Sequence, residues 1–189
     1  MGETVPSLIL NADQKAVLLD LAYRSIDNYV RKQPFPDIKL DDPDLLQLSG
    51  VFVTIWNKSG LRGCIGHVNA DMQLYKAVQE MAVSAASRDP RFDSLTEDEL
   101  LEGIKVEISV LSPMARVKTI DEIIIGKHGL MIEQRGRRGL LLPKVASDRG
   151  WSKETFLEHL CMKAGLPRDS WQQDSVLYIF TAFEFGEKY

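Results

Sequence analysis

Apolar residues between positions 12 and 32 recur every three to four residues, which is the period of one helical face. Asn11 and Gln14 have the types and the spacing of a capping box at the start of this segment. The same period returns over residues 71–88, before Pro90. We therefore predict two amphipathic helices, each with one face in a hydrophobic core.

Strand patterns fill much of the remaining chain. Residues 51–56 and 61–66 are extended, largely apolar runs on either side of an Asn-Lys-Ser-Gly turn, and together they predict a β-hairpin. Over residues 103–112 apolar and polar residues alternate, which is typical of a strand with one buried face. Further strands are predicted at 129–134, 139–142 and 176–185.

Two shorter signals complete the set of predicted elements. Thr96 and Glu99 form a second capping-box pair and predict a short helix, and a further helix is expected at about 153–164. A chain of 189 residues corresponds to about one domain. Helices and mostly hairpin-connected strands in this order predict an α+β fold, with an antiparallel sheet packed with helices.

The composition excludes several classes of function. Lys and Arg number 23 against 27 Asp and Glu, and this net charge of −4 argues against nucleic-acid binding, which needs clustered cations. Two cysteines without paired or Cys/His spacing predict no metal site and no disulfide, and favour a reducing, cytoplasmic setting. No common nucleotide or hydrolase motif occurs, so we expect no cofactor. No apolar stretch approaches the ~18 residues of a membrane span.

The most informative segment is Leu-Arg-Gly-Cys-Ile-Gly at residues 61–66. Gly63 and Gly66 allow close approach of backbone or ligand. The period of an extended strand places Arg62 and Cys64 on one side, where a guanidinium favours the nucleophilic thiolate. The pattern fits a second interpretation equally, in which Cys64 is a small buried residue of a glycine-marked strand.

Two further residues could exchange protons. His128 follows Lys127 in a glycine-bounded turn, which either presents the imidazole to a cleft or leaves it in solvent. Glu107 falls on the polar face of its alternating strand, where it acts as a general base if that face lines a pocket. The alternative for Glu107 is an ordinary exposed carboxylate.

Asp89 and Arg91 place an acid and a base beside Pro90, where the second helix ends. They either shape a binding cleft or form a local ion pair. Cys161 differs from Cys64, because it shares a helical face with apolar residues of the 153–164 segment. We therefore expect Cys161 to be an inert core residue.

Several segments of the chain, taken in order, resemble those of one known family. The segments are 50–54, 61–66, 89–92, 107–111, 126–130 and 141–143. Together they resemble the AMMECR domain, and the resemblance covers about residues 10–186 of a single domain spanning 1–189. The compact length resembles the prokaryotic branch, AmmeMemoRadiSam system protein A, whose members are encoded beside a Memo-like protein and a radical S-adenosylmethionine enzyme.

This resemblance implies an α+β fold of a larger and a smaller subdomain with a cleft between them. It implies that the motif at 61–66 is the suspected site and that the two neighbouring proteins are partners, and it supplies no reaction. We favour a component that binds a substrate or partner, because no complete pair of a base and its orienting group is recognisable. Its binding residues would be Arg62, Gly63, Gly66, Asp89, Arg91 and Lys127.

The alternative is a cysteine-dependent enzyme. Cys64 would be the nucleophile or thiol carrier, with His128 or Glu107 as proton acceptor. We also predict that Arg62, Cys64 and His128 border one concave surface, and a joint role of Cys64 and His128 depends on this.

Overall fold

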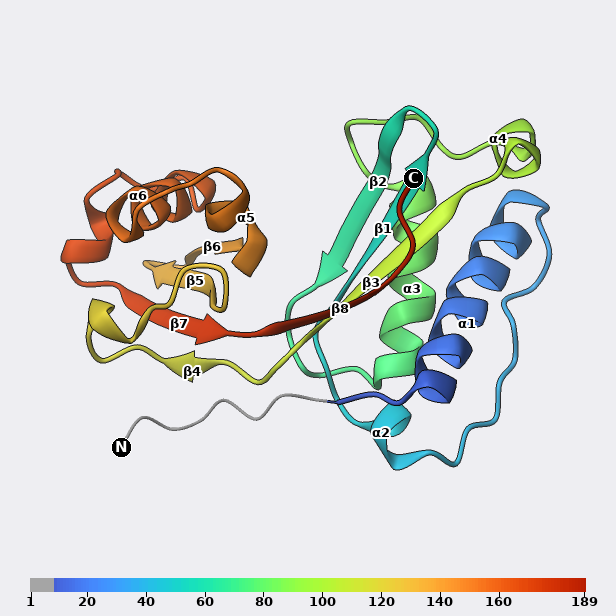
Figure 1. The fold of residues 1–189 in the computed structure, drawn as a ribbon, viewed down its shortest axis with the longest axis horizontal. Coiled ribbons are helices and arrows are strands. Elements are labelled where there is room, and N and C mark those ends of the chain that lie inside the picture. Colours follow the sequence, from blue (N-terminus) through green and yellow to red (C-terminus); the bar gives the residue numbers. More distant parts are fainter. Residues whose placement is uncertain (1–8) are drawn as a thin grey trace. The chain divides into compact units, whose positions relative to one another are not determined.

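The computed structural model describes residues 9–189, which form two compact units (Figure 1). Residues 9–111 and 183–189 make up the larger unit, and residues 112–182 make up the smaller one. Each unit has its own sheet and its own hydrophobic core. A larger and a smaller part agree with the implied subdomains, whereas the cleft and the single domain over 1–189 stay predictions.

The larger unit is a four-stranded sheet with helices on one face (Figure 1). The strand order is β2-β1-β3-β8, and β1 runs antiparallel to both of its neighbours. The elements in chain order are α1 (Ala12–Val30), α2 (Pro43–Leu46), β1 (Val51–Asn57), β2 (Gly60–His67), α3 (Leu74–Ser87), α4 (Glu97–Glu102), β3 (Lys105–Leu111) and β8 (Ala182–Gly186).

The first helix begins at its predicted cap. Asn11 Oδ1 accepts a hydrogen bond from the Gln14 N–H at 2.9 Å, and Gln14 Oε1 accepts one from the Asn11 N–H at 2.8 Å. These reciprocal bonds satisfy two N–H groups that a helix start leaves without partners. Leu18, Leu21 and Ile26 then project into the core, so the predicted apolar face of α1 is confirmed.

Helix α3 packs closely on the backbone of β2 because the residues in contact have small side chains or none. Ala82, Ala85 and Ala86 are buried on the helix. A Cβ added at Gly63 would lie only 2.1 Å from the Ala85 carbonyl oxygen. Gly63 is therefore required for helix–sheet packing, and its lack of a side chain sets the distance of α3 from β2.

The smaller unit is a second four-stranded sheet, with strand order β4-β7-β5-β6 and antiparallel neighbours. Its core includes Phe156, Leu160 and Cys161, so the predicted core position of Cys161 is confirmed. The main elements are β4 (Ala115–Arg116), β5 (Gly129–Gln134), β6 (Arg137–Leu141), α5 (Pro143–Asp148), α6 (Lys153–Lys163) and β7 (Val176–Phe180).

The fold class is confirmed, but the predicted single strand over 176–185 is wrong. It consists of β7 and β8, which belong to different sheets. Thr181 separates them, since its N–H bonds the Ser112 hydroxyl and its carbonyl accepts from the Ser112 N–H, each at 2.9 Å. The short α2, β4 and α5 were not predicted, because segments of two to six residues show little periodicity and these lack the cap pair or the strand pairing across a turn that marked α4, β5 and β6.

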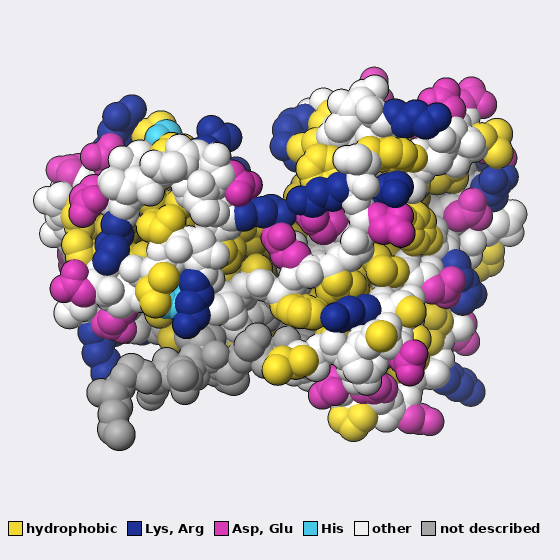
Figure 2. All heavy atoms as spheres, viewed as in Figure 1, with side chains coloured by type: hydrophobic (Ala, Val, Ile, Leu, Met, Phe, Trp, Pro, Cys, Tyr) yellow, Lys and Arg dark blue, Asp and Glu magenta, His cyan; other side chains and the backbone are white. Residues whose placement is uncertain are grey.

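The helices and the surface bear on two of the classes discussed from composition, and the absence of nucleic-acid binding stays a prediction. Among the helices of the described residues, none has both the length and the apolar character to cross a bilayer. Figure 2 shows Lys and Arg side chains interspersed with Asp and Glu. The face in view therefore lacks the continuous basic surface that a nucleic-acid backbone requires.

Candidate binding site beside Cys64

Cys64 belongs to a row of three polar side chains across the sheet of the larger unit. Thr54 of β1 is paired with Cys64 of β2 on one side and with Glu107 of β3 on the other. Side chains that lie opposite each other on neighbouring strands project from the same face. Their neighbours Val53 and Val106 are buried in the core with the helices, so the row occupies the opposite face.

The Cys64 residue is held by both its side chain and its backbone. The Thr54 hydroxyl donates to Cys64 Sγ at 3.2 Å, and the Cys64 N–H donates to Asp89 Oδ2 at 2.8 Å. Cys64 is partly exposed, which differs from the interpretation of it as a small buried residue. Its thiol lies on a sheet face with a hydroxyl beside it.

Asp89 joins the segment after α3 to the edge strand β2. Besides the Cys64 N–H, its carboxylate accepts from the backbone N–H of Arg91 and from the Nε and NH2 groups of that side chain. The Asp89 side chain is only 2% exposed. Hydrogen bonds from the Arg91 guanidinium hold the pKa of Asp89 well below its usual range. The local ion pair is confirmed, and it also fixes the backbone at Cys64.

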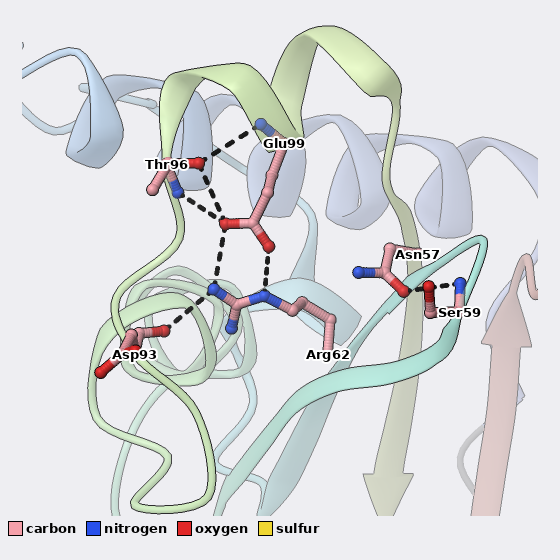
Figure 3. Close-up of polar contacts among 6 residues, drawn as sticks. All are labelled: Asn57, Ser59, Arg62, Asp93, Thr96 and Glu99. Atoms are coloured by element: carbon pink, nitrogen blue, oxygen red, sulfur yellow. Dashed lines mark hydrogen bonds and ion pairs between the residues drawn. The ribbon is translucent and has the colours of Figure 1, made fainter.

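The guanidinium of Arg62 makes its hydrogen bonds with α4 and the loop before it (Figure 3). Nε and NH2 bond the two carboxylate oxygens of Glu99, and NH2 also donates to the Asp93 carbonyl at 2.9 Å. These bonds from Arg62 lower the pKa of Glu99. Arg62 therefore attaches α4 to β2, a role that the motif at 61–66 did not suggest.

The strict alternation that placed Arg62 beside Cys64 fails because the strand pair contains an irregularity. Leu61 is paired with Trp56 and Gly63 with Ile55, so Arg62 is an additional residue in β2. A β-bulge of this kind redirects side chains locally. The expectation of regular period-2 geometry at Arg62 is corrected accordingly.

An open cavity of about 550 Å³ lies next to these contacts, on the larger unit. Arg62, Arg91, Phe92 and Glu99 are among its lining residues. The Phe92 ring has both guanidinium carbons nearby, at 5.6 Å for Arg62 and 5.5 Å for Arg91. The arginines of two predicted binding segments are therefore brought together around one aromatic ring, although they are far apart in the sequence.

Glu107 is buried rather than exposed. It is 6% exposed, and Lys188 Nζ lies 3.0 Å from its Oε2. The same ammonium lies 5.4 Å from the centre of the Trp56 ring. The exposed-carboxylate alternative is wrong because β8 and the residues after it bring a cation to this row.

His128 lies in the smaller unit and is also buried, at 6% exposure. Its Nδ1 accepts a hydrogen bond from the Ile124 N–H at 3.2 Å, which closes the turn before β5. Burial, together with the charge of exposed Lys127, lowers the pKa of His128. The solvated alternative is wrong, while a surface shared by His128 and Cys64 stays a prediction.

Gly63 and Gly66, the two glycines of the motif at 61–66, each lie in close contact with other residues of the larger unit. Gly63 faces the Ala85 carbonyl of α3, as described above. At Gly66 an added Cβ would lie 2.2 Å from the ring of Phe52, its partner on β1. Both glycines therefore have a packing role within the larger unit.

Sequence reasoning missed three of these residues as site residues: Thr54, Glu99 and Lys188. Glu99 was recognised only as the capping partner of Thr96, which it also is, with Oε2 3.0 Å from the Thr96 N–H. Regular pairing of the predicted hairpin would place Val53 opposite Cys64, and only the additional residue Arg62 shifts the partner to Thr54, so no local signal indicated Thr54. Nothing in the local sequence indicated Lys188. Among residues 9–189 no group of three or more His, Cys, Asp and Glu side chains is arranged to hold a metal ion.

A family model described as AMMECR1 matches residues 19–185. Protein MK0488 of Methanopyrus kandleri is 37% identical over 188 residues, covering 95% of this chain and 91% of that protein. A protein of Methanothermobacter thermautotrophicus is 39% identical over 186 residues, covering 94% of this chain and 96% of its own.

The fold is also similar to a solved one. The crystal structure of the uncharacterized protein PH0010 from Pyrococcus horikoshii matches with a TM-score of 0.84 and 36% identity. The match covers 92% of this chain and 91% of that one.

Proposed function

The chain belongs to the AMMECR1 family, and we propose that it acts there as a binding component. It presents a substrate or a protein segment on the surface formed by β2 and the loop after α3. The partners that receive this ligand are a Memo-like protein and a radical S-adenosylmethionine enzyme. The setting is the cytoplasm.

The observation that carries this proposal is that Arg62 and Asp89 form hydrogen bonds that hold the protein's own backbone and side chains. A nucleophilic thiolate gains most from a cation or base held beside it. Arg62 instead bonds Glu99 and the Asp93 carbonyl, and Arg91, whose charge does interact with Cys64, is paired with the Asp89 carboxylate, which accepts from four donors. These groups keep a loop in place around an open cavity, which is an arrangement suited to binding rather than to turnover.

The proposal is tested with the purified chain, alone and with both partner proteins. We expect the isolated chain to show no turnover, to associate with at least one partner, and to increase the consumption of S-adenosylmethionine by the radical enzyme. Cys64→Ser is compared with Cys161→Ser, which changes the buried thiol only. Turnover by the isolated chain that is lost in Cys64→Ser would overturn the binding role.

A second candidate function, a cysteine-dependent enzyme, is favoured by the row across the sheet. Cys64 and Glu107 flank Thr54 on the same face. The row therefore places a buried carboxylate two strands from the thiol, on the same face of the sheet. In this function Cys64 is the nucleophile and Glu107 the proton acceptor, and Glu107→Gln would lower turnover without weakening partner association.

A further inference from the structure

The geometry points to a ligand class for the cavity beside β2. We infer that it binds an uncharged ligand rich in carbonyl oxygens, such as a segment of peptide backbone, through the NH1 groups of Arg62 and Arg91. The inference rests on the proposed binding function and names the chemistry of what is bound.

The first step concerns the hydrogen-bond donors that the two arginines leave unused. A guanidinium carries five N–H donors. Arg62 uses Nε and NH2 for Glu99 and Asp93, and Arg91 uses Nε and NH2 for Asp89. Within residues 9–189, neither NH1 group has a hydrogen-bond partner, and Figure 3 shows the third nitrogen of Arg62 without a contact.

The second step is that these donors are held in place. Glu99 binds Arg62, and Asp89 binds Arg91, at the same edge of the guanidinium, the one formed by Nε and Nη2. The other edge is therefore oriented before a ligand arrives, which reduces the side-chain entropy lost on binding. The Arg91 side chain is 54% exposed and that of Arg62 is 11% exposed, and both line the cavity.

The third step is the charge, which selects the class of ligand. The cavity and its supports hold two cations, Arg62 and Arg91, and three carboxylates, those of Asp89, Asp93 and Glu99. The sum, 2 − 3 = −1, gives a phosphate or a carboxylate no net Coulombic attraction. A neutral carbonyl oxygen accepts the same N–H donors without this repulsion.

The shape agrees with a planar, partly apolar ligand. Phe92 contributes an aromatic surface to the cavity wall, and the guanidinium carbons of Arg62 and Arg91 lie 5.6 and 5.5 Å from its ring centre. Peptide groups are flat and stack on such surfaces, while their carbonyl oxygens lie at the edge. Bound across Phe92, a short peptide segment would reach the NH1 group of each arginine.

The experiment uses the full chain with arginine side chains labelled with ¹⁵N. The probe is the uncharged capped peptide N-acetyl-Ala-Ala-Ala-amide, with inorganic phosphate and acetate as charged probes. We expect the capped peptide to shift the Arg62 and Arg91 Nε–H signals saturably. Its affinity should change less than about twofold between low and high salt, because no net charge is neutralised. Stronger shifts with phosphate or acetate, or none with the peptide, would overturn the inference.

Variants localise the binding. We expect Arg91→Ala to weaken peptide binding by about tenfold, which corresponds to ~1.4 kcal/mol. Arg91→Lys should weaken it similarly, because an ammonium has no second edge to present. Phe92→Leu preserves the ion pairs and should weaken binding less. The matched control is Arg168→Ala, an exposed arginine of the smaller unit close to Glu158, which should bind as the parent does.

The same variants separate this inference from the proposed function. If the partner proteins still associate with the chain while the peptide never binds, the ligand class is wrong and the binding function stands. If neither the partners nor the peptide bind, both are wrong. Equal weakening by Arg91→Ala and Arg168→Ala would place the peptide elsewhere and overturn the inference.

Discussion

Strand β2 and helix α6 each carry one cysteine, and the two thiols differ in exposure and in their polar contacts. Cys64 is partly exposed on a sheet face, with a hydroxyl donor at its sulfur and a carboxylate at its backbone N–H. Cys161 is fully buried, and burial raises the pKa of its thiol. Cys64 is supported by polar side chains on an accessible strand, whereas Cys161 is buried against the backbone of Trp171 and Ser170, so a ligand of a thiol is to be sought at β2.

The largest effect is expected from glycine substitutions at the contacts of β2 with α3 and of β6 with the end of α6. Gly63→Ala on β2 places a Cβ against the Ala85 carbonyl, and Gly139→Ala on β6 places one 2.6 Å from the Ala164 nitrogen. We expect Gly63→Ala to lower the free energy of unfolding by about 3 kcal/mol, because the opposing atom lies inside α3. Gly139→Ala should lose about 1–2 kcal/mol, since the end of α6 can shift.

Urea denaturation, followed by circular dichroism and tryptophan fluorescence, measures both losses. Lys58→Ala, in the exposed hairpin turn, is the control and should stay within about 0.5 kcal/mol of the parent. A loss at Gly139 that equals or exceeds the one at Gly63 would contradict the tighter packing assigned to β2.

The next effect concerns the carboxylate that supports Cys64. Asp89→Asn should lower the free energy of unfolding by about 2 kcal/mol at neutral pH, because it removes a buried, ion-paired acceptor. The pKa of Asp89 is depressed in the folded chain, so this stability is present above the ordinary value of about 4 and is lost as the pH falls below it. Parent and variant should therefore converge in acid.

Asp93→Asn is the matched control for Asp89→Asn, since Asp93 bonds Arg62 through its backbone carbonyl. It should change stability by less than about 0.5 kcal/mol. A difference between parent and Asp89→Asn that persists unchanged below pH 3 would show that the charge of Asp89 is not what stabilises the loop.

The reactivity of the two thiols is the direct test of the comparison. We expect a brief iodoacetamide pulse to modify Cys64 at least about tenfold faster than Cys161, a difference of ~1.4 kcal/mol in barrier. Cys161 is buried and its raised pKa disfavours the thiolate. Mass-spectrometric mapping measures both rates, and equal labelling, or Cys161 first, would remove the case for a functional Cys64.

The smallest effect is expected at His128, the polar residue that closes a turn in the smaller unit. Its pKa is lowered in the folded chain, so the unfolded chain takes up the proton first. Stability should therefore decrease as the pH falls below the ordinary value of about 6.5. His128→Gln should remove this part of the pH dependence, whereas His159→Gln in α6 should retain it; the same curve for both variants would contradict the assignment.

Local sequence was sufficient for the longer helices, for the first hairpin and for the core position of Cys161. The capping box at Asn11 and the apolar faces of α1 and α3 depend on residues three to four positions apart, whose geometry the chain itself imposes. The core position of Cys161 followed from the same period. The hairpin of β1 and β2 was predicted because its turn and its alternation lie in one short segment.

The contacts of the candidate site required the folded chain. Arg62 bonds Glu99, 37 positions away, and Glu107 is paired with Lys188, near the other end of the chain. Which cation meets which carboxylate depends on the bulge at Arg62 and on the return of β8 to the first sheet. Periodicity describes which side of an element is apolar, whereas the partner of a polar side chain is decided by segments that only tertiary packing brings together.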